Sequence, residues 1–237
     1  PTISVGGILP VIGGNIRVGN SETFVTEACE YTNSFLSFFP KISLILNIDA
    51  DHLDFFKDIE DIRHSFRLFA EKLPADGTLI INSDTDKYTE IIRDLPCEII
   101  TYGLNSNADY TAQNIQYNEY GYATFDCVKD GVNLGTYSLS VPGIHNVSNA
   151  LATLVLGFKL GLNSEALKTG LKHFQGTDRR FQYKGKVGEV TVIDDYAHHP
   201  TEIKATLTAA KNYPHKSLWC VFQPHTYTRT KALLPEF

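Results

Sequence analysis

The sequence of 237 residues has no methionine, one tryptophan and four cysteines. The cysteines are far apart, and no two of them form a C-x-x-C pair: Cys29, Cys97, Cys127 and Cys220. This spacing argues against a disulfide framework and is typical of reduced, buried thiols in a cytoplasmic protein.

Long apolar runs and an excess of positive charge are also missing. No apolar run approaches the roughly 20 residues of a membrane span. The net charge of −6 argues against a nucleic-acid or membrane surface, so an anionic ligand would need local cations or helix N-termini. With 43% apolar and 20% charged residues, the composition is that of a soluble globular protein with one large or two ordinary domains.

The first half of the sequence predicts a parallel sheet. The nearly continuous apolar run at 42–48 is expected of a strand buried on both faces. Residues 59–73 place apolar side chains every three or four positions, as in an amphipathic helix. Short strands are expected at 77–84 and 98–103, and this alternation of strands and helices favours a parallel sheet with helical crossovers.

The pattern changes after residue 107. Tyrosine-rich short strands over 108–142 predict a small antiparallel sheet, and helices are expected at 148–162 and after Ser164 as a cap. The polar, glycine-rich segment 176–188 is typical of a linker between domains. A strand–helix–strand unit is expected to follow it over 190–222.

Three of the predicted strands end in clusters of polar side chains. The clusters are "DADHLD" at 49–54, "DDYAHHP" at 194–200 and "QPHTYTR" at 223–229. Because ligands bind beyond the carboxyl ends of parallel strands, we expect one composite site between two domains. Each cluster also has a simpler interpretation, since Asp and Asn are ordinary turn and N-cap residues.

The first cluster predicts a cation site. Three carboxylates and one imidazole within six residues are costly together unless they are solvated or bound to a cation: Asp49, Asp51, His52 and Asp54. An oxygen-rich site with one imidazole suits Mg²⁺ or Mn²⁺.

Two further stretches suggest a nucleotide. Asn146 and Asn149 lie three residues apart at a predicted helix start, and their amides offer the donors and acceptors that an adenine edge needs. Arg179 and Arg180 at the domain junction could grip phosphate. Simple helix capping and a solvated basic linker remain open for these two stretches.

The order of the motifs resembles the Mur ligase family over essentially the whole chain. The matching stretches are "EACEY", "NIDADHLD", "PGIHNVSNA", "GTDRRF", "IDDYAHHPTEI" and "FQPHTYTRT", of which the last two together are the most specific. The resemblance implies an α/β fold with a P-loop-like central domain over 1–176, which has a mostly parallel sheet and a small antiparallel sheet. Residues 177–237 would begin a Rossmann-like α/β C-terminal domain.

The resemblance implies an ATP-dependent amide ligase of peptidoglycan precursor synthesis in the cytoplasm. In the branch that it matches, ATP phosphorylates the muramic acid carboxylate of UDP-N-acetylmuramate, and L-alanine attacks the acyl phosphate. The expected cofactors are ATP and Mg²⁺, with Mn²⁺ as an alternative. The expected partners are these small molecules, with neither nucleic acid nor a membrane, and the oligomeric state is open.

The family's site residues carry over one by one. Glu27 and His52 match its metal ligands, and Asn146 and Asn149 match its adenine contacts. Asp195 matches its ribose contact.

Other matching residues would serve the reacting groups. Arg180 matches the arginine that reaches the terminal phosphates. His199, His225 and Arg229 resemble residues around the incoming amino acid, where the arginine would pair with the carboxylate and leave the amine free. Thr226 stands where many relatives carry arginine, so this pocket would depend more heavily on Arg229.

Departures from the family keep alternatives open. The family's GxxGKT phosphate loop would lie upstream of Pro1, so we expect a fragment that is inactive alone. A murein peptide ligase is the nearest rival, although Tyr196 and Glu202 favour the alanine branch. Two other hypotheses remain, a non-catalytic nucleotide- or metal-binding module and a dinuclear metal hydrolase.

Overall fold

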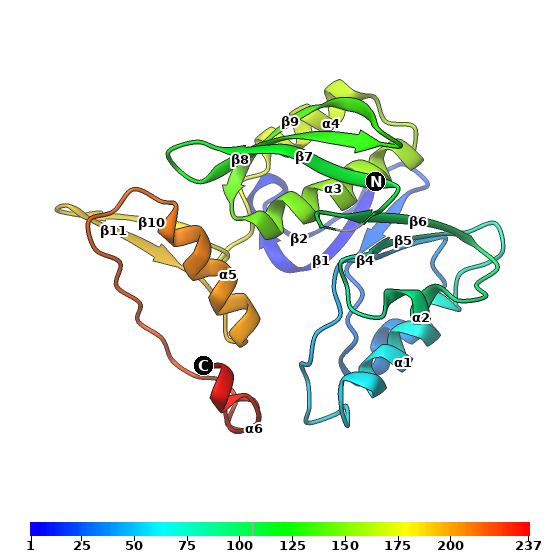
Figure 1. The fold of residues 1–237 in the computed structure, drawn as a ribbon, viewed down its shortest axis with the longest axis horizontal. Coiled ribbons are helices and arrows are strands. Elements are labelled where there is room, and N and C mark those ends of the chain that lie inside the picture. Colours follow the sequence, from blue (N-terminus) through cyan, green and yellow to red (C-terminus); the bar gives the residue numbers. More distant parts are fainter. Residues whose placement is uncertain (106) are drawn as a thin grey trace.

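A six-stranded sheet forms the centre of the structure (Figure 1). The computed structural model describes residues 1–105 and 107–237. The strand order is β4-β5-β6-β7-β8-β9. The strands are β4 (Ile42–Ile45), β5 (Thr78–Asn82), β6 (Glu98–Gly103), β7 (Tyr110–Tyr117), β8 (Tyr122–Lys129) and β9 (Val132–Pro142).

The strand directions confirm the expected change along the chain. β4 to β7 are parallel neighbours, whereas β7, β8 and β9 are antiparallel. The antiparallel strands do not form a sheet of their own, because Tyr102 and Gly103 of β6 pair with Tyr110 and Thr111 of β7. The predicted parallel and antiparallel parts are therefore one continuous sheet.

Helices cover both faces of this sheet. α1 (Ile59–Ala70) and α2 (Tyr88–Ile92) pack on the face to which Leu79 and Ile81 point. Ile80, between them in β5, points to the opposite face, where α3 (Ile144–Lys159) and α4 (Ser164–His173) lie. All three β5 side chains are fully buried, as predicted for a strand covered on both sides.

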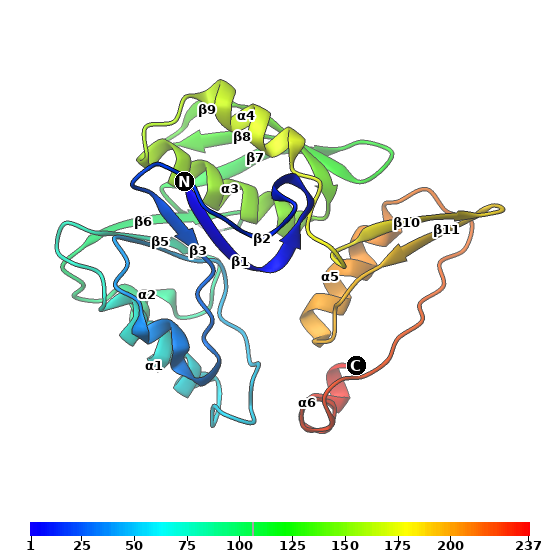
Figure 2. The same cartoon turned by 180° about the vertical axis from the view of Figure 1, so that it is seen from behind.

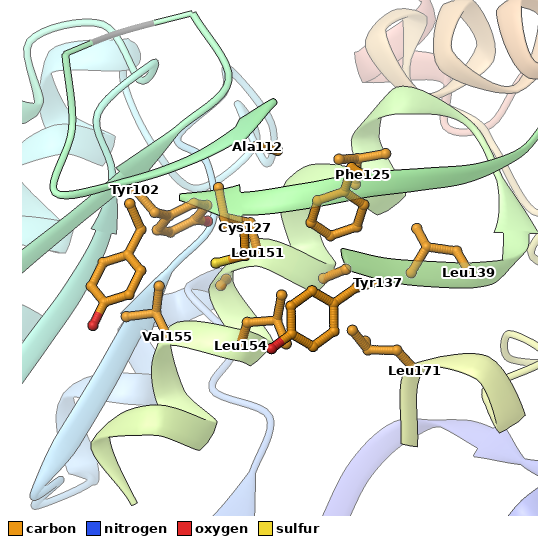
Figure 3. Packing of buried hydrophobic residues seen from close by; sticks show 14 of the residues in the cluster. Tyr102, Ala112, Phe125, Cys127, Tyr137, Leu139, Leu151, Leu154, Val155 and Leu171 are labelled. Atoms are coloured by element: carbon orange, nitrogen blue, oxygen red, sulfur yellow. The ribbon is translucent and has the colours of Figure 1, made fainter. Parts of the chain in front are cut away.

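The larger hydrophobic core lies between the sheet and α3. Figure 3 shows Phe125 and Tyr137 of the antiparallel strands packing with Leu151 and Leu154 of α3. These four side chains are fully buried. This packing fixes α3, whose first turns carry the asparagines proposed to bind adenine.

The cap of α4 differs from the prediction by one residue. The Asn163 side chain accepts a hydrogen bond from the backbone N–H of Ala166 at 2.8 Å, so Asn163 is the N-cap. Ser164 is the first helical residue, and its hydroxyl lies 3.2 Å from the Tyr137 hydroxyl. The Ser164 side chain therefore contacts the sheet and does not cap the helix.

A small three-stranded sheet precedes the central one. It has the order β2-β1-β3 and consists of β1 (Thr2–Leu9), β2 (Gly14–Arg17) and β3 (Phe24–Thr26), with the 3-10 helix η1 (Pro10–Ile12) between the first two. A second 3-10 segment, η2 (Tyr31–Ser37), leads to β4.

Residues after 176 form a second lobe (Figures 1 and 2). Its elements are β10 (Gln182–Val187), β11 (Val190–Asp194), α5 (Pro200–Lys211), α6 (Tyr227–Ala232) and the 3-10 helix η3 (Leu234–Glu236). β10 and β11 are an antiparallel hairpin, so residues 182–187 of the predicted linker at 176–188 are a strand. Its glycine-rich composition concealed the alternation that pairs it with β11.

The strand predicted at 217–222 is not formed. This segment is extended chain between α5 and α6, and Trp219 and Val221 are 89% and 101% exposed. A strand is stable only when neighbouring strands satisfy its backbone hydrogen bonds. In the described chain β11 pairs with β10, and no strand lies beside residues 217–222.

An aromatic contact joins the two lobes near the end of α5. The Tyr213 ring lies 5.8 Å from that of Tyr120 in the first lobe and 6.1 Å from that of Phe181 in its own lobe, measured between ring centroids. Gly121 beside this contact has a φ of 72°, a backbone conformation that favours glycine. Within the described residues, the helices are too short or too polar to cross a lipid bilayer.

Candidate active site between the two lobes

The segments that follow β4 and β11 meet across the gap between the lobes. We call residues 49–54 the acidic loop. Thr201 of α5 donates its hydroxyl hydrogen to Asp49 Oδ2 at 2.7 Å, and His199 Nε2 lies 3.1 Å from the carbonyl oxygen of Ala50. Residues about 150 positions apart therefore form one polar contact between the lobes.

The third predicted cluster reaches the same loop through Arg229. Its Nε and Nη2 donate to Asp51 Oδ1 at 3.0 and 2.8 Å. Thr226 caps the short helix α6 that carries Arg229, since its side chain accepts from the Arg229 backbone N–H. The two charged side chains are only 12% and 28% exposed, so the pair is largely shielded from water.

Burial raises the pKa of Asp51, but other interactions outweigh this effect. The hydrogen bond from Arg229, the backbone N–H of His52 and the charges of both residues leave the pKa below its usual value. A pocket of about 60 Å³ lies beside this pair. Its walls are Ala50, Asp51, His52, Leu53, Asp54, Thr226, Thr228, Arg229, Ala232 and Leu233.

His199 uses both of its ring nitrogens. Nδ1 accepts from the backbone N–H of Thr201 at 3.3 Å, and Nε2 faces the Ala50 carbonyl, which can only accept. These contacts fit an imidazole that carries hydrogen on Nε2. Glu202 completes a capping box at the start of α5, and His199 is only 7% exposed.

The four residues expected to bind nucleotide are divided between α3 and the second lobe. Asn146 and Asn149 are both in the first half of α3, and Asn146 Nδ2 donates to the Pro142 carbonyl at 2.7 Å. Burial lowers the pKa of the neighbouring His145; the charge of Asp195 opposes this shift and that of Arg180 adds to it. Arg180 and Asp195 of the second lobe are therefore close enough to the start of α3 for their charges to act on His145.

A cavity of about 480 Å³ borders this region. Arg180 forms part of its wall, together with Pro142, Phe181 and Tyr213. The cavity thus lies where both lobes and the connection between them meet.

Arg180 is held toward α5 by Glu202. Its Nη1 lies 3.0 Å from Glu202 Oε1, and the arginine side chain is 52% exposed. Burial raises the pKa of Glu202, but the His198 backbone N–H and Arg180 outweigh it, so the pKa is below its usual value. Exposed ion pairs contribute little to stability, so Arg180 can exchange this partner for another anion.

Asp195 is the hydrogen-bonding centre of the second lobe. Its Oδ2 accepts from the Phe181 backbone N–H at 2.9 Å and the Thr206 hydroxyl at 3.0 Å. Its Oδ1 accepts from the Ala197 backbone N–H at 2.7 Å. One carboxylate thus ties together the start of β10, the loop after β11 and α5.

We predict that Asp195→Ala lowers the free energy of unfolding by about 2–3 kcal/mol, since three donors lose a charged acceptor. Chemical denaturation of the variant measures this change. Asp194→Ala is the matched control, because Asp194 forms only a 3.6 Å ion pair with Arg179, and its effect is expected within about 0.5 kcal/mol. Equal stability of the two variants would contradict this structural role.

The acidic loop does not gather its carboxylates around one cation. Asp49 accepts from Thr201, Asp51 from Arg229, and Asp54 from the Tyr31 hydroxyl at 2.9 Å. Among residues 1–105 and 107–237, no group of three His, Cys, Asp or Glu side chains is placed to hold a metal ion. The expected site of three carboxylates and one imidazole is therefore not formed, because each carboxylate turns to a different partner.

The two metal ligands expected from the resemblance contact different partners. Glu27 Oε2 accepts from the Gly6 backbone N–H at 2.6 Å. His52 stacks on Tyr31 at 4.5 Å between ring centroids, and its Nε2 lies 3.5 Å from Glu30 Oε1. The sequence reasoning missed Glu30, although it belongs to the quoted "EACEY" motif.

Thr201 was also missed, and the partners of Asp51 and His199 were not foreseen. The only available signal was the position of Thr201 directly after the "DDYAHHP" cluster. His225 contributes its carbonyl oxygen, which accepts from Arg229 Nη1 at 2.8 Å.

Two Mur ligase domain models match the chain. The Mur ligase middle domain matches residues 12–157, and the Mur ligase glutamate ligase domain matches residues 179–237. The UDP-N-acetylmuramate–L-alanine ligase of Agathobacter rectalis is 61% identical over the whole chain, which covers 52% of that relative. The chain thus spans about half the length of the curated relatives it matches.

Solved structures share the fold. The UDP-N-acetylmuramate–alanine ligase of Thermotoga maritima has a TM-score of 0.76 and 29% identity, over 90% of this chain and 47% of that one. A murein peptide ligase of Psychrobacter arcticus has a TM-score of 0.65 and 24% identity, over 85% and 45% of the two chains, which shows a common fold alone. Because the middle domain matches more than half of the sequence, the chain belongs to the Mur ligase family.

Proposed function

We propose that the full-length protein uses ATP to join L-alanine to the muramic acid carboxylate of UDP-N-acetylmuramate, in the cytoplasm. The observation that carries this proposal is the meeting of the acidic loop with His199, Thr201 and Arg229 of the second lobe. The names of the curated relatives support the same reaction. In this proposal residues 1–176 are the ATP-binding domain and residues 177–237 begin the C-terminal domain.

The nucleotide is proposed to bind at the start of α3. Asn146 and Asn149 would contact adenine, Asp195 the ribose and Arg180 the terminal phosphates. The γ-phosphoryl group passes to the substrate carboxylate and ADP leaves; the amine then attacks the acyl phosphate and releases phosphate. Such transfers depend on positioning and on neutralising charge, which Arg180 can supply from the second lobe.

The amino acid is proposed to bind beside Arg229, with His199 and His225 nearby. An arginine can hold a carboxylate in two-point fashion. The pocket of about 60 Å³ next to it favours a small amino acid.

Mg²⁺, or Mn²⁺ in its place, is proposed to bind with Glu27 and His52 as protein ligands. Magnesium in nucleotide sites usually keeps several waters and takes only one or two protein ligands besides phosphate oxygens. A carboxylate and an imidazole therefore fit without a preformed protein cage.

Gly6 provides a test of the proposed metal ligand. A Cβ at residue 6 would lie 3.1 Å from Glu27 Oε2, so Gly6→Ala is expected to displace this carboxylate. We predict that the Mg²⁺ concentration for half-maximal activity rises about ten-fold, the lower end of the effect of disturbing the surroundings of a metal ligand.

Magnesium titration of phosphate release by the full-length protein measures this change. Gly14→Ala is the control, because a Cβ there has no atom within 4 Å. An unchanged magnesium dependence in Gly6→Ala would count against Glu27 as a ligand.

The reaction itself is tested by phosphate release from ATP with Mg²⁺ and UDP-N-acetylmuramate, using the full-length protein. Release that requires L-alanine would support the proposal. Release only with the recycled tripeptide would assign the protein to the murein peptide ligase branch. No release with either would favour a non-catalytic binding module.

A further inference from the structure

The guanidinium of Arg229 is fixed by three hydrogen bonds. Nε and Nη2 donate to Asp51 Oδ1, and Nη1 donates to the carbonyl of His225 at 2.8 Å. A guanidinium has five N–H bonds, one on Nε and two on each terminal nitrogen. These three contacts leave one N–H on Nη1 and one on Nη2, a pair whose spacing matches the two oxygens of a carboxylate.

Asp51 is itself held in place. Its Oδ1 also accepts from the backbone N–H of His52 at 2.7 Å, and its Oδ2 lies 4.0 Å from His52 Nε2. The carboxylate therefore cannot turn freely. A long, flexible arginine of the second lobe is thus seated on a short, immobilised carboxylate of the first.

We propose that Asp51 is a positioning residue that orients Arg229, so that the two remaining N–H bonds face the carboxylate of the incoming amino acid. This inference rests on the proposed function. The site takes an α-amino acid, because its carboxylate completes the hydrogen bonding of the arginine while its amine stays outside the contact.

A second contact between the lobes allows the orientation of Arg229 to be tested separately from the closure of the two lobes. Thr201 donates to Asp49, two residues before Asp51, and this bond also holds the lobes together. It does not contact Arg229. Thr201→Val therefore weakens closure alone, whereas Asp51→Ala removes the partner of the arginine as well.

The test is steady-state kinetics of the full-length protein with ATP, UDP-N-acetylmuramate and L-alanine. Asp51→Ala is expected to raise KM for L-alanine about ten-fold, the effect of one lost charge-assisted hydrogen bond, with KM for ATP within about two-fold. Asp51→Asn keeps one oxygen acceptor for Arg229 and is expected to give a smaller increase. Thr201→Val is expected to leave KM for L-alanine within about two-fold, and thermal denaturation checks that all variants are folded.

An equal rise in KM for L-alanine in Thr201→Val and Asp51→Ala would overturn the proposal, because closure alone would then explain it. The proposal would also be overturned if Asp51→Ala changed the KM values for ATP, UDP-N-acetylmuramate and L-alanine equally, or left the KM for L-alanine unchanged. A wild-type protein without L-alanine-dependent release would overturn the proposed function together with this inference. An active wild type with unaffected variants would overturn only the role of Asp51.

Discussion

Replacing Arg180 with alanine is expected to lower kcat of L-alanine-dependent phosphate release about 1000-fold. An arginine brought from a second domain onto a transferring phosphoryl group contributes about 10³–10⁵ in kcat. In the proposed site Arg180 comes from the second lobe, and its charge acts on His145 at the start of α3. Its present partner is Glu202, at 3.0 Å.

The Glu202→Gln variant tests whether Arg180 acts in catalysis or only stabilises the structure. Glutamine keeps an oxygen that can accept the His198 backbone N–H, but it loses the charge that pairs with Arg180. If the arginine acts on phosphate, Glu202→Gln retains kcat within about three-fold, because breaking an exposed pair costs little. Similar large losses in both variants would show that Arg180 serves only to hold α5. Single-turnover measurements at saturating ATP would exclude weaker binding as the cause.

Replacing Arg229 with alanine is expected to lower kcat/KM for L-alanine about 100-fold. The variant loses two hydrogen bonds to the substrate carboxylate, and about 1.5 kcal/mol for each, the lower end for bonds to charged groups, accounts for a loss of this order. It also leaves Asp51, whose side chain is 28% exposed, without its cationic partner. The kcat/KM of Arg229→Lys for L-alanine is expected to lie between those of the wild type and Arg229→Ala, because an ammonium cannot hold both carboxylates in fork geometry.

Initial-rate kinetics with varied L-alanine at saturating ATP and UDP-N-acetylmuramate measure this effect. Arg93→Ala is a matched control, because it removes an exposed arginine at the end of α2, away from the acidic loop. A loss in Arg229→Ala that high L-alanine concentrations cannot offset would place the arginine in the chemical step. An unchanged kcat/KM would exclude Arg229 from the amino-acid site.

The sequence predicted best those elements whose signal is local. The apolar run at 42–48 and the segment 77–84 form β4 and β5, and the helical spacing over 59–73 forms α1. Consecutive apolar residues are buried in β5, whereas α1 buries residues spaced along one side of the helix, among them Ile62 and Phe69. The family resemblance likewise rests on short stretches of consecutive residues.

Predictions failed where a partner elsewhere in the chain decides the structure. Residues 182–187 looked like a linker, but they are a strand because β11 pairs with them. Residues 217–222 looked like a strand, but no strand pairs with them in the described chain. Ser164 had a suitable side chain for capping, yet Asn163 caps the helix.

The candidate site shows the same difference between features that are local in the sequence and contacts between distant residues. The sequence alone determined that carboxylates, imidazoles and an arginine follow three strand ends or apolar runs, because that is a matter of residue type and local periodicity. Only the tertiary structure decided that Asp49 meets Thr201 and that Asp51 meets Arg229, at sequence separations of 152 and 178 residues. Such pairs depend on how two lobes pack against each other, and this packing leaves no periodic trace along the chain.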